Sequence, residues 1–255
     1  MTTSAERPAA LVTGGAHRLG RALALALADR GHDIALHCHA SRVPAAETSS
    51  LIRRAGVECE VLEADLAQPE SAERLIRSAH ARFPALRVLV NNAARYDQMN
   101  LLDTSAATFD AVMAVNLRAP FLLIQAFART VASGDIINIV DNKIAFNQHA
   151  YGAYLLAKRA LADLTRLAAL ELAPAIKVNA IAPGVVLPNE ARTAEYLRWR
   201  VEGIPIGRPG SPSDVILALM YLLDSPFVTG QVLVVDGGES VAHVGRHAAN
   251  ARSQT

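Results

Sequence analysis

Short runs of β-branched and aliphatic residues alternate along this chain with longer segments rich in Ala, Leu and Arg. Such alternation is typical of βαβ units, which build a parallel sheet. Strands this apolar are covered by helices on both faces. The runs that predict strands are 9–13, 33–38, 57–64, 87–93, 135–140, 176–183 and 231–238. We therefore expect an α/β fold with a doubly wound, seven-stranded parallel sheet flanked by helices.

The segments between the strands carry apolar residues at helical spacing. The predicted helices are 18–30, 69–83, 108–132, 151–172 and 212–223. No linker rich in Pro, Gly or Ser and no internal repeat interrupts the pattern, so residues 1–240 are expected to form a single domain. Residues 185–209, around Trp199, lack the regular pattern and are expected to form a substrate lid. The polar tail, 241–255, is expected to be disordered at its end.

Composition narrows the classes of partner. The apolar stretches are interrupted before the roughly 18 residues that a bilayer-spanning helix needs, so no membrane segment is expected. The first residues lack the features of a secretory signal, which favours a cytoplasmic protein. With 25 Lys and Arg against 24 Asp and Glu, no basic stripe for nucleic acid is expected, and a small-molecule substrate is favoured. Cys38 and Cys59 lack the spacing of a zinc site, so no metal is expected.

A glycine-containing turn follows the first predicted strand and opens an Ala- and Leu-rich helix. Glycines let a phosphate approach the backbone, and the free amides at a helix start favour negative charge. The turn would equally serve as a tight strand-to-helix connection. Its position favours the nucleotide, with the binding residues Thr13, Gly14, His17, Arg18, Leu19 and Gly20.

The end of the second strand usually selects the cofactor, because an acid there bonds the ribose 2′-hydroxyl and repels a 2′-phosphate. This strand ends without an acid, and His39, Ser41 and Arg42 could receive a phosphate together with Arg18. The same residues could be ordinary solvated polar groups. We expect NADPH rather than NADH. Asp65, followed by Leu66, is placed to bond the adenine, or to cap the next helix.

Tyr154 and Lys158 are four residues apart within a predicted helix and therefore share one face. A nearby ammonium stabilises phenolate and is expected to lower the pKa of the tyrosine toward the range of an acid/base catalyst. Taken alone, the same spacing would more often be a surface pair.

Five motifs in order resemble the short-chain dehydrogenase/reductase family over nearly the whole chain: TGG at 13–15, NNAA at 91–94, Asn116, the Tyr154 and Lys158 pair, and Pro183-Gly184. The resemblance implies a Rossmann-type fold that binds nucleotide and performs hydride transfer at a nicotinamide. It further implies a catalytic group containing Asn116, Tyr154 and Lys158, with Lys158 also holding the nicotinamide ribose. Asn92, Ala93, Pro183 and Gly184 would contact the cofactor, and a homotetramer is implied.

Two departures from the family resemble its pteridine reductase and dihydromonapterin reductase branch. Asp141 lies thirteen residues before Tyr154, where the family usually has serine, and Arg18 replaces a usual glycine. Further similarities to that branch are LHCHAS at 36–41, INIVD at 137–141, LTRLAALELAP at 164–174, KVNAIAP at 177–183 and LPNE at 187–190.

Pterin chemistry agrees with these departures, because a ring nitrogen needs a proton when hydride reaches the neighbouring carbon. Asp141 could bond Tyr154 or relay its proton, and Arg18 could bridge the cofactor phosphate and the pterin. Tyr96 aligns with an aromatic residue that in pteridine reductases sandwiches the ring, or it is a plain loop aromatic under the lid. The predicted substrate-binding residues are Arg18, Tyr96, Asp141 and Tyr154.

Three functions stay open. The first is NADPH-dependent reduction of a dihydropterin of the dihydromonapterin, dihydrobiopterin or dihydrofolate type. The second is a carbonyl reductase of the same family acting on a ketoacyl, sugar or alcohol-type substrate, against which Asp141 counts because its charge would repel a developing alkoxide. The third is a catalytically silent NADP(H)-sensing or scaffold protein, since a fold alone does not prove activity.

Overall fold

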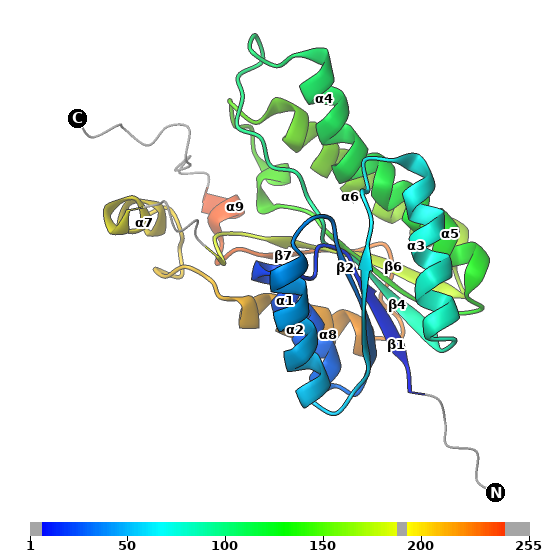
Figure 1. Ribbon diagram of the computed structural model, residues 1–255. Helices are drawn as coiled ribbons and strands as arrows, with labels where there is room; N and C mark the ends of the chain where they lie inside the picture. Colours follow the sequence, from blue (N-terminus) through cyan, green and yellow to red (C-terminus); the bar gives the residue numbers. More distant parts are fainter. Residues whose placement is uncertain (1–6, 188–192, 243–255) are drawn as a thin grey trace, which may run out of the picture.

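The computed structural model describes residues 7–187 and 193–242, and over these ranges it forms a three-layer α/β fold (Figure 1). A single seven-stranded sheet has the order β3-β2-β1-β4-β5-β6-β7, and every neighbouring pair is parallel. The predicted fold class is therefore confirmed. The strands are β1 (Ala9–Val12), β2 (Asp33–Cys38), β3 (Cys59–Glu63), β4 (Leu86–Asn91), β5 (Gly134–Ile139), β6 (Ile176–Pro183) and β7 (Val232–Val235).

Helices connect successive strands, and a short helix follows the last strand. They are α1 (Arg18–Asp29), α2 (Arg42–Arg54), α3 (Pro69–Arg82), α4 (Ala106–Met113), α5 (Ala119–Thr130), α6 (Gly152–Leu172), α7 (Ala194–Val201), α8 (Pro212–Asp224) and α9 (Glu239–Ala242). A π-helical segment, η1 (Ala114–Arg118), joins α4 to α5, and a 3-10 turn, η2 (Asn142–Ala145), follows β5.

The sequence pattern did not predict α2. This helix contains Pro44 in its first turn and buries a small face of Ala45, Thr48, Ser49 and Ile52, so its apolar periodicity is weak. The expected lid, 185–209, contains α7, whereas its residues 188–192 and the tail from 243 to 255 lie outside the described residues.

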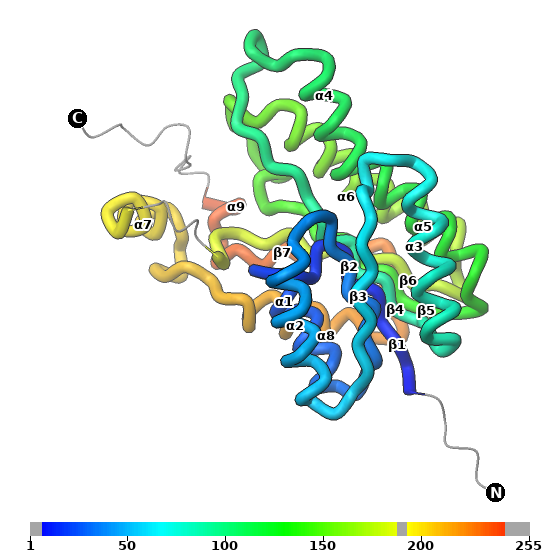
Figure 2. Tube along the Cα trace, viewed as in Figure 1, coloured from blue at the N-terminus to red at the C-terminus, as the bar shows by residue number. Residues whose placement is uncertain are grey.

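Alternate residues of β1 face opposite helical layers, as a strand buried on both faces requires. Ala10 and Val12 pack into the layer formed by α1, α2 and α8, while Ala9 and Leu11 pack toward α3 and α5. The trace in Figure 2 shows these two layers on opposite sides of the strands. Two apolar cores thus hold the sheet between them.

The helical run Ala106–Thr130 is long and apolar enough, by length and composition, to cross a bilayer. Half of its most apolar window is buried, and Leu123 and Phe127 pack into the core shared with α3. Core helices of folded proteins are often as long and as apolar, so this run is only weak evidence for a membrane segment.

The strand order reverses between β1 and β4, and the connections after these two strands meet at the carboxyl edge of the sheet. Thr13 joins them, because its hydroxyl accepts bonds from the amides of Asn92 and Ala93 at 2.9 and 3.1 Å. The Asn92 amide group donates to the carbonyls of Thr13 and Gly14 at 2.9 and 3.1 Å. These bonds fix the glycine turn against the loop after β4.

Gly20 lies where α1 passes this junction, and a methyl group there would meet the Gly14 carbonyl oxygen and the Asn92 Nδ2 atom, the latter at 2.6 Å. We expect Gly20→Ala to lower the free energy of unfolding by about 1–3 kcal/mol, because backbone must move to relieve the overlap. Gly152→Ala is the matched control, since a Cβ there has no atom within 4 Å. Thermal and urea unfolding of both variants would measure the difference. Equal stabilities would contradict the close approach.

Candidate active site

A cleft of about 600 Å³ opens at the carboxyl edge beside the glycine turn. Its lining includes eleven of the predicted cofactor-binding residues: Gly14, His17, Arg18, Leu19, Gly20, His39, Ser41, Asp65, Leu66, Asn92 and Ala93. Thr13 lies behind this wall and braces it through the bonds described above. Sequence elements far apart along the chain thus form one surface.

The start of α1 has the features expected of a phosphate site. His17, at the N-cap, makes no side-chain capping bond, and the first backbone bond of the helix runs from the Arg21 amide to the His17 carbonyl. Amides in the first turn of a helix favour an anion. Arg18 adopts a left-handed conformation with φ of 53°, the region that favours glycine. The glycine turn and the start of α1 therefore fit the phosphates of a dinucleotide. Arg18 adds a cation at a position where the family usually has no side chain.

His37 supports the turn from below and was not predicted. The Gly14 amide donates to His37 Nδ1 at 3.1 Å, so His37 Nε2 carries the proton and donates to the Ala64 carbonyl at 3.0 Å. Burial lowers the pKa of His37, which agrees with a neutral ring. The sequence offered only a histidine in an apolar strand, without an indication of its partners.

The structure separates the residues predicted to bind a 2′-phosphate. His39 and Ser41 line the cleft, and His39 Nε2 lies 4.0 Å from Asp65 Oδ1. Arg42 is not among the lining residues and instead pairs with Glu63, with Nε at 2.6 Å from Oε2. The Arg42 guanidinium lowers the pKa of Glu63 and keeps this carboxylate ionised. A direct role of Arg42 at the phosphate stays a prediction.

A second cleft, of about 590 Å³, adjoins the first and shares Arg18 and Leu19 with it. Loops after β4, β5 and β6 contribute to its wall, and α6 and α7 complete it. Its lining residues are Arg18, Leu19, Tyr96, Asp141, Asn142, Lys143, Tyr154, Gly184, Val185, Val186, Leu187, Tyr196, Leu197 and Arg200. All four predicted substrate-binding residues therefore meet in this second cleft, which we call the substrate cleft after them. Gly184 lies here rather than in the first cleft, and Pro183 ends β6 beside it.

Tyr154 and Asp141 form the central contact of this cleft. The Tyr154 hydroxyl donates to Asp141 Oδ2 at 2.9 Å, and Asp141 Oδ1 accepts the Lys143 amide at 2.9 Å. Burial raises the pKa of Tyr154 well above its usual range, and the Asp141 carboxylate adds to the effect. The expectation of a lowered Tyr154 pKa is wrong for this structure, because burial and the Asp141 carboxylate raise it. The Tyr154 hydroxyl is therefore protonated at neutral pH.

Lys158 lies one helical turn further along α6 and is fully buried. Its Nζ donates to the Ile139 carbonyl at 2.7 Å and lies 5.8 Å from the centre of the Tyr154 ring. Burial lowers the Lys158 pKa to about 8, so the side chain is mostly protonated at neutral pH. The helical spacing therefore brings an ammonium beside the tyrosine, as predicted.

Asn116 lies in the π-helical segment rather than on the wall of the cleft. Its Nδ2 atom donates to the carbonyls of Val112 and Arg95 at 2.9 and 2.8 Å. The Arg95 amide donates back to Asn116 Oδ1 at 3.3 Å. A widened helical turn is frequent at functional sites. In this π-helical turn, the Asn116 side chain binds the backbone of Arg95, the neighbour of Tyr96. The catalytic role of Asn116 stays a prediction.

Tyr96 is half exposed, and its side chain lines the cleft. It stacks on Tyr151 with ring centres 4.9 Å apart and meets Tyr154 edge-on at 4.7 Å. A flat ring could stack on such a surface.

Two charged residues at the site were not predicted. Arg200, on α7, lines the substrate cleft and forms a buried ion pair with Glu239 of α9. Glu239 also accepts a bond from Asn142, the neighbour of Asp141, at 3.0 Å. The second unpredicted charged residue is Lys143, in the η2 turn, which also lines this cleft. Neither side chain belongs to a sequence motif. The fold brings Arg200 to the cleft, whereas Lys143 follows Asp141 by two residues.

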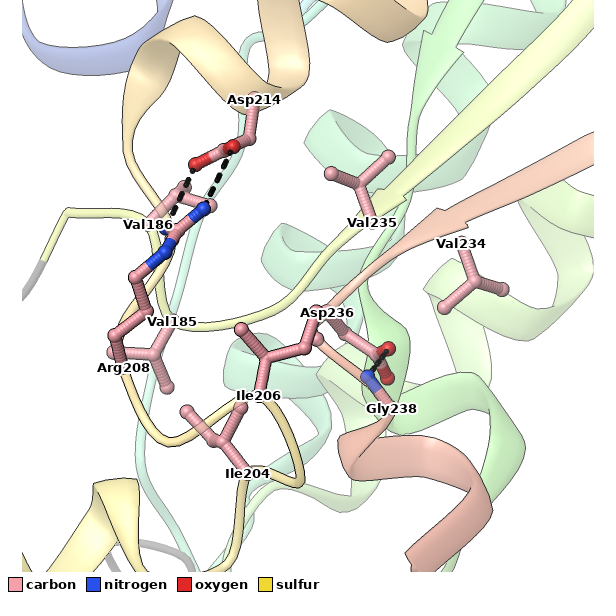
Figure 3. A pocket seen from close by; sticks show the side chains of 12 residues that line it. Val185, Val186, Ile204, Ile206, Arg208, Asp214, Val234, Val235, Asp236 and Gly238 are labelled. Atoms are coloured by element: carbon pink, nitrogen blue, oxygen red, sulfur yellow. Dashed lines mark hydrogen bonds and ion pairs between the residues drawn. The ribbon is translucent and has the colours of Figure 1, made fainter.

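A third cavity, of about 290 Å³, adjoins the substrate cleft and shares Val185 and Val186 with it. Figure 3 shows valine and isoleucine side chains around it, with Arg208 and Asp214 facing each other at one side. None of the predicted site residues lines it. Within the described part of the chain, no group of three or more His, Cys, Asp or Glu could hold a metal ion.

Comparison with known proteins identifies relatives over nearly the whole chain. A family model described as enoyl-(acyl carrier protein) reductase matches residues 14–240. An uncharacterized oxidoreductase of Mycobacterium tuberculosis is 36% identical over 239 residues, which are 90% of each chain. A 3-oxoacyl-[acyl-carrier-protein] reductase of Staphylococcus epidermidis is 31% identical, covering 90% of this chain and 97% of the relative. Dihydromonapterin reductase of Enterobacter is also 31% identical, covering 93% and 98%.

Solved structures give the same family. FolM alternative dihydrofolate reductase 1 from Brucella suis, in complex with NADP, has a TM-score of 0.87 and 32% identity, covering 92% of this chain and 95% of that chain. Acetoin dehydrogenase from Salmonella typhimurium has a TM-score of 0.85 and 33% identity, covering 95% and 99%. With Tyr154 and Lys158 side by side at the carboxyl edge of a seven-stranded parallel sheet, these matches show that the chain is an oxidoreductase of the short-chain dehydrogenase/reductase family.

Proposed function

We propose that this protein reduces a dihydropterin, of the dihydromonapterin, dihydrobiopterin or dihydrofolate type, to its tetrahydro form with NADPH. The observation that carries the proposal is the bond from the Tyr154 hydroxyl to the Asp141 carboxylate. The likeness to dihydromonapterin reductase and to the FolM structure supports it.

NADPH, when bound, supplies a hydride to a carbon of the substrate C=N bond and leaves as NADP⁺. The residues of the chain manage the proton that the neighbouring nitrogen must gain. Because the pKa of Tyr154 is raised, its hydroxyl stays protonated until a basic nitrogen accepts the proton. The Lys158 ammonium, 5.8 Å from the ring centre, then stabilises the charge left on the tyrosine.

Asp141 and Tyr96 would select the substrate. The Asp141 carboxylate can accept a bond from an N–H group of a pterin or help return a proton to Tyr154, whereas it would repel the alkoxide formed from a ketone. The exposed Tyr96 ring would stack on the flat heterocycle, worth about 0.5–1.5 kcal/mol beyond area burial.

A carbonyl reductase of the same family is the second candidate, because the 3-oxoacyl reductase relative is as similar as the dihydromonapterin reductase. A silent nucleotide-sensing protein is the third. The convergence of Tyr154, Asp141 and Lys158 in one cleft favours activity over this last alternative.

We expect NADPH to bind more tightly than NADH. Arg42→Ala should weaken NADPH selectively, because Arg42 either reaches the 2′-phosphate or neutralises Glu63, which would otherwise repel it. Glu63→Gln, the matched variant, should leave NADPH binding unchanged or stronger. Fluorescence titration of NADPH and NADH against the wild type and both variants measures the six affinities. Equal or tighter NADH binding by the wild type would refute the assignment.

Tyr154→Phe should lower kcat by about 100- to 10,000-fold, the usual contribution of a positioned acid, with little change in cofactor affinity. Lys158→Ala should lower both turnover and cofactor affinity, as the family resemblance implies. Steady-state kinetics and cofactor titration separate the two effects. Near-normal turnover in the phenylalanine variant would make Asp141 the acid instead.

Asp141→Ser distinguishes the two enzyme candidates. A dihydropterin reductase should lose kcat/KM because the carboxylate beside Tyr154 is gone, although a hydroxyl remains. A ketone reductase should keep or gain activity, because a serine hydroxyl can donate to a carbonyl oxygen. The measurement is kcat/KM for the best dihydropterin and the best ketone with each enzyme. Retained dihydropterin reduction together with dominant ketone activity would rule out the proposal.

A further inference from the structure

Lys143 places a positive charge at the substrate cleft that none of the reaction steps above uses. It is the second residue after Asp141, within the η2 turn, and it is half-buried. We propose that the Lys143 ammonium binds an anionic group on the side chain of the substrate. The inference rests on the proposed function and narrows it to dihydropterins whose substituent carries a carboxylate or a phosphate.

Aromatic rings hold the ammonium in place. Lys143 Nζ donates to the Tyr96 hydroxyl oxygen at 3.2 Å and lies 5.6 Å from the centre of the Tyr96 ring. The Tyr151 ring centre is 5.2 Å away. Contacts of this kind orient a cation without neutralising its charge. The side chain is therefore positioned and still able to pair with an anion.

No Asp or Glu of the described ranges forms an ion pair with Lys143, and this distinguishes it from Arg200 at the same cleft and from Lys177 at the other edge of the sheet. Lys177 pairs with Asp135 at 3.0 Å, and Arg200 pairs with Glu239. Among the residues that line the cleft, the cations are Arg18, Lys143 and Arg200, and the carboxylate is Asp141. Because Glu239 compensates the Arg200 charge and Arg18 also lines the cofactor cleft, Lys143 is the lining cation that is placed to meet an anionic group of the substrate.

The position of Lys143 identifies the part of the substrate that it would meet. The reacting ring must lie near the Tyr154 hydroxyl, and the Tyr96 ring, whose centre is 4.7 Å from that of Tyr154, is close enough for the same ring to stack on it. Lys143 contacts the Tyr96 hydroxyl, which is at the tip of that ring. A substituent that extends past this end reaches the ammonium, whereas the ring itself does not need it.

The test compares two substrates with the same reacting ring, dihydrofolate with two carboxylates on its side chain and dihydrobiopterin with a neutral one. In the wild type we expect the lower KM for dihydrofolate. Lys143→Gln should raise that KM about 10-fold, as expected for loss of a charge-assisted contact, with kcat nearly kept and dihydrobiopterin changed less than about 2-fold. Lys143→Arg should restore most of the difference. Added salt should raise the dihydrofolate KM of the wild type more than that of Lys143→Gln.

Arg77→Gln is the charge-matched control, because Arg77 lies on the exposed face of α3 and pairs only with Glu73 there among the described residues. It should leave both KM values unchanged. Equal losses for both pterins in Lys143→Gln, unchanged values for both, or a wild-type preference for dihydrobiopterin would each overturn the inference. A wild type that reduces ketones but neither pterin would instead overturn the proposed function, and this outcome is visible before any variant is made.

Discussion

The parallel alignment of the seven strands is the constraint on which the whole site depends. Because all strands run in one direction, the loops after β1, β4, β5 and β6 leave the sheet at a single edge. Thr13 and Asn92 cross-link the first two of these loops where the strand order reverses. The nucleotide cleft and the substrate cleft lie side by side at this edge and share Arg18. Chemistry that needs a cofactor and a substrate in contact follows directly from this arrangement.

Burial then sets the electrostatics at the centre of the site. Tyr154 and Lys158 are both buried, and their pKa values move in opposite directions, upward for the phenol and downward for the ammonium. Asp141 strengthens the first shift because it accepts the Tyr154 proton in a hydrogen bond. The result is a protonated tyrosine beside a carboxylate. This pairing suits delivery of a proton to a nitrogen better than stabilisation of an alkoxide.

The fold alone does not choose between a pterin and a ketone, because relatives with either kind of name are equally similar to this chain. The choice depends on a few side chains at the cleft. In the proposed function, Asp141 would act at the reacting atom, Tyr96 would select the shape of the substrate, and Lys143 would select the charge of its substituent. These residues lie on loops after β4 and β5, where substitutions alter the site without disturbing the strands.

By itself the sequence determined the strand and helix alternation, the glycine turn and the four-residue spacing of Tyr154 and Lys158, because these depend on local periodicity and backbone conformation. Helix α2 escaped prediction because its buried face is small and partly polar. Tertiary structure decided the rest, since contacts between distant segments leave no local pattern. It paired Arg42 with Glu63, brought His37 under the glycine turn, and raised the pKa of Tyr154 by burial that no spacing of residues reveals.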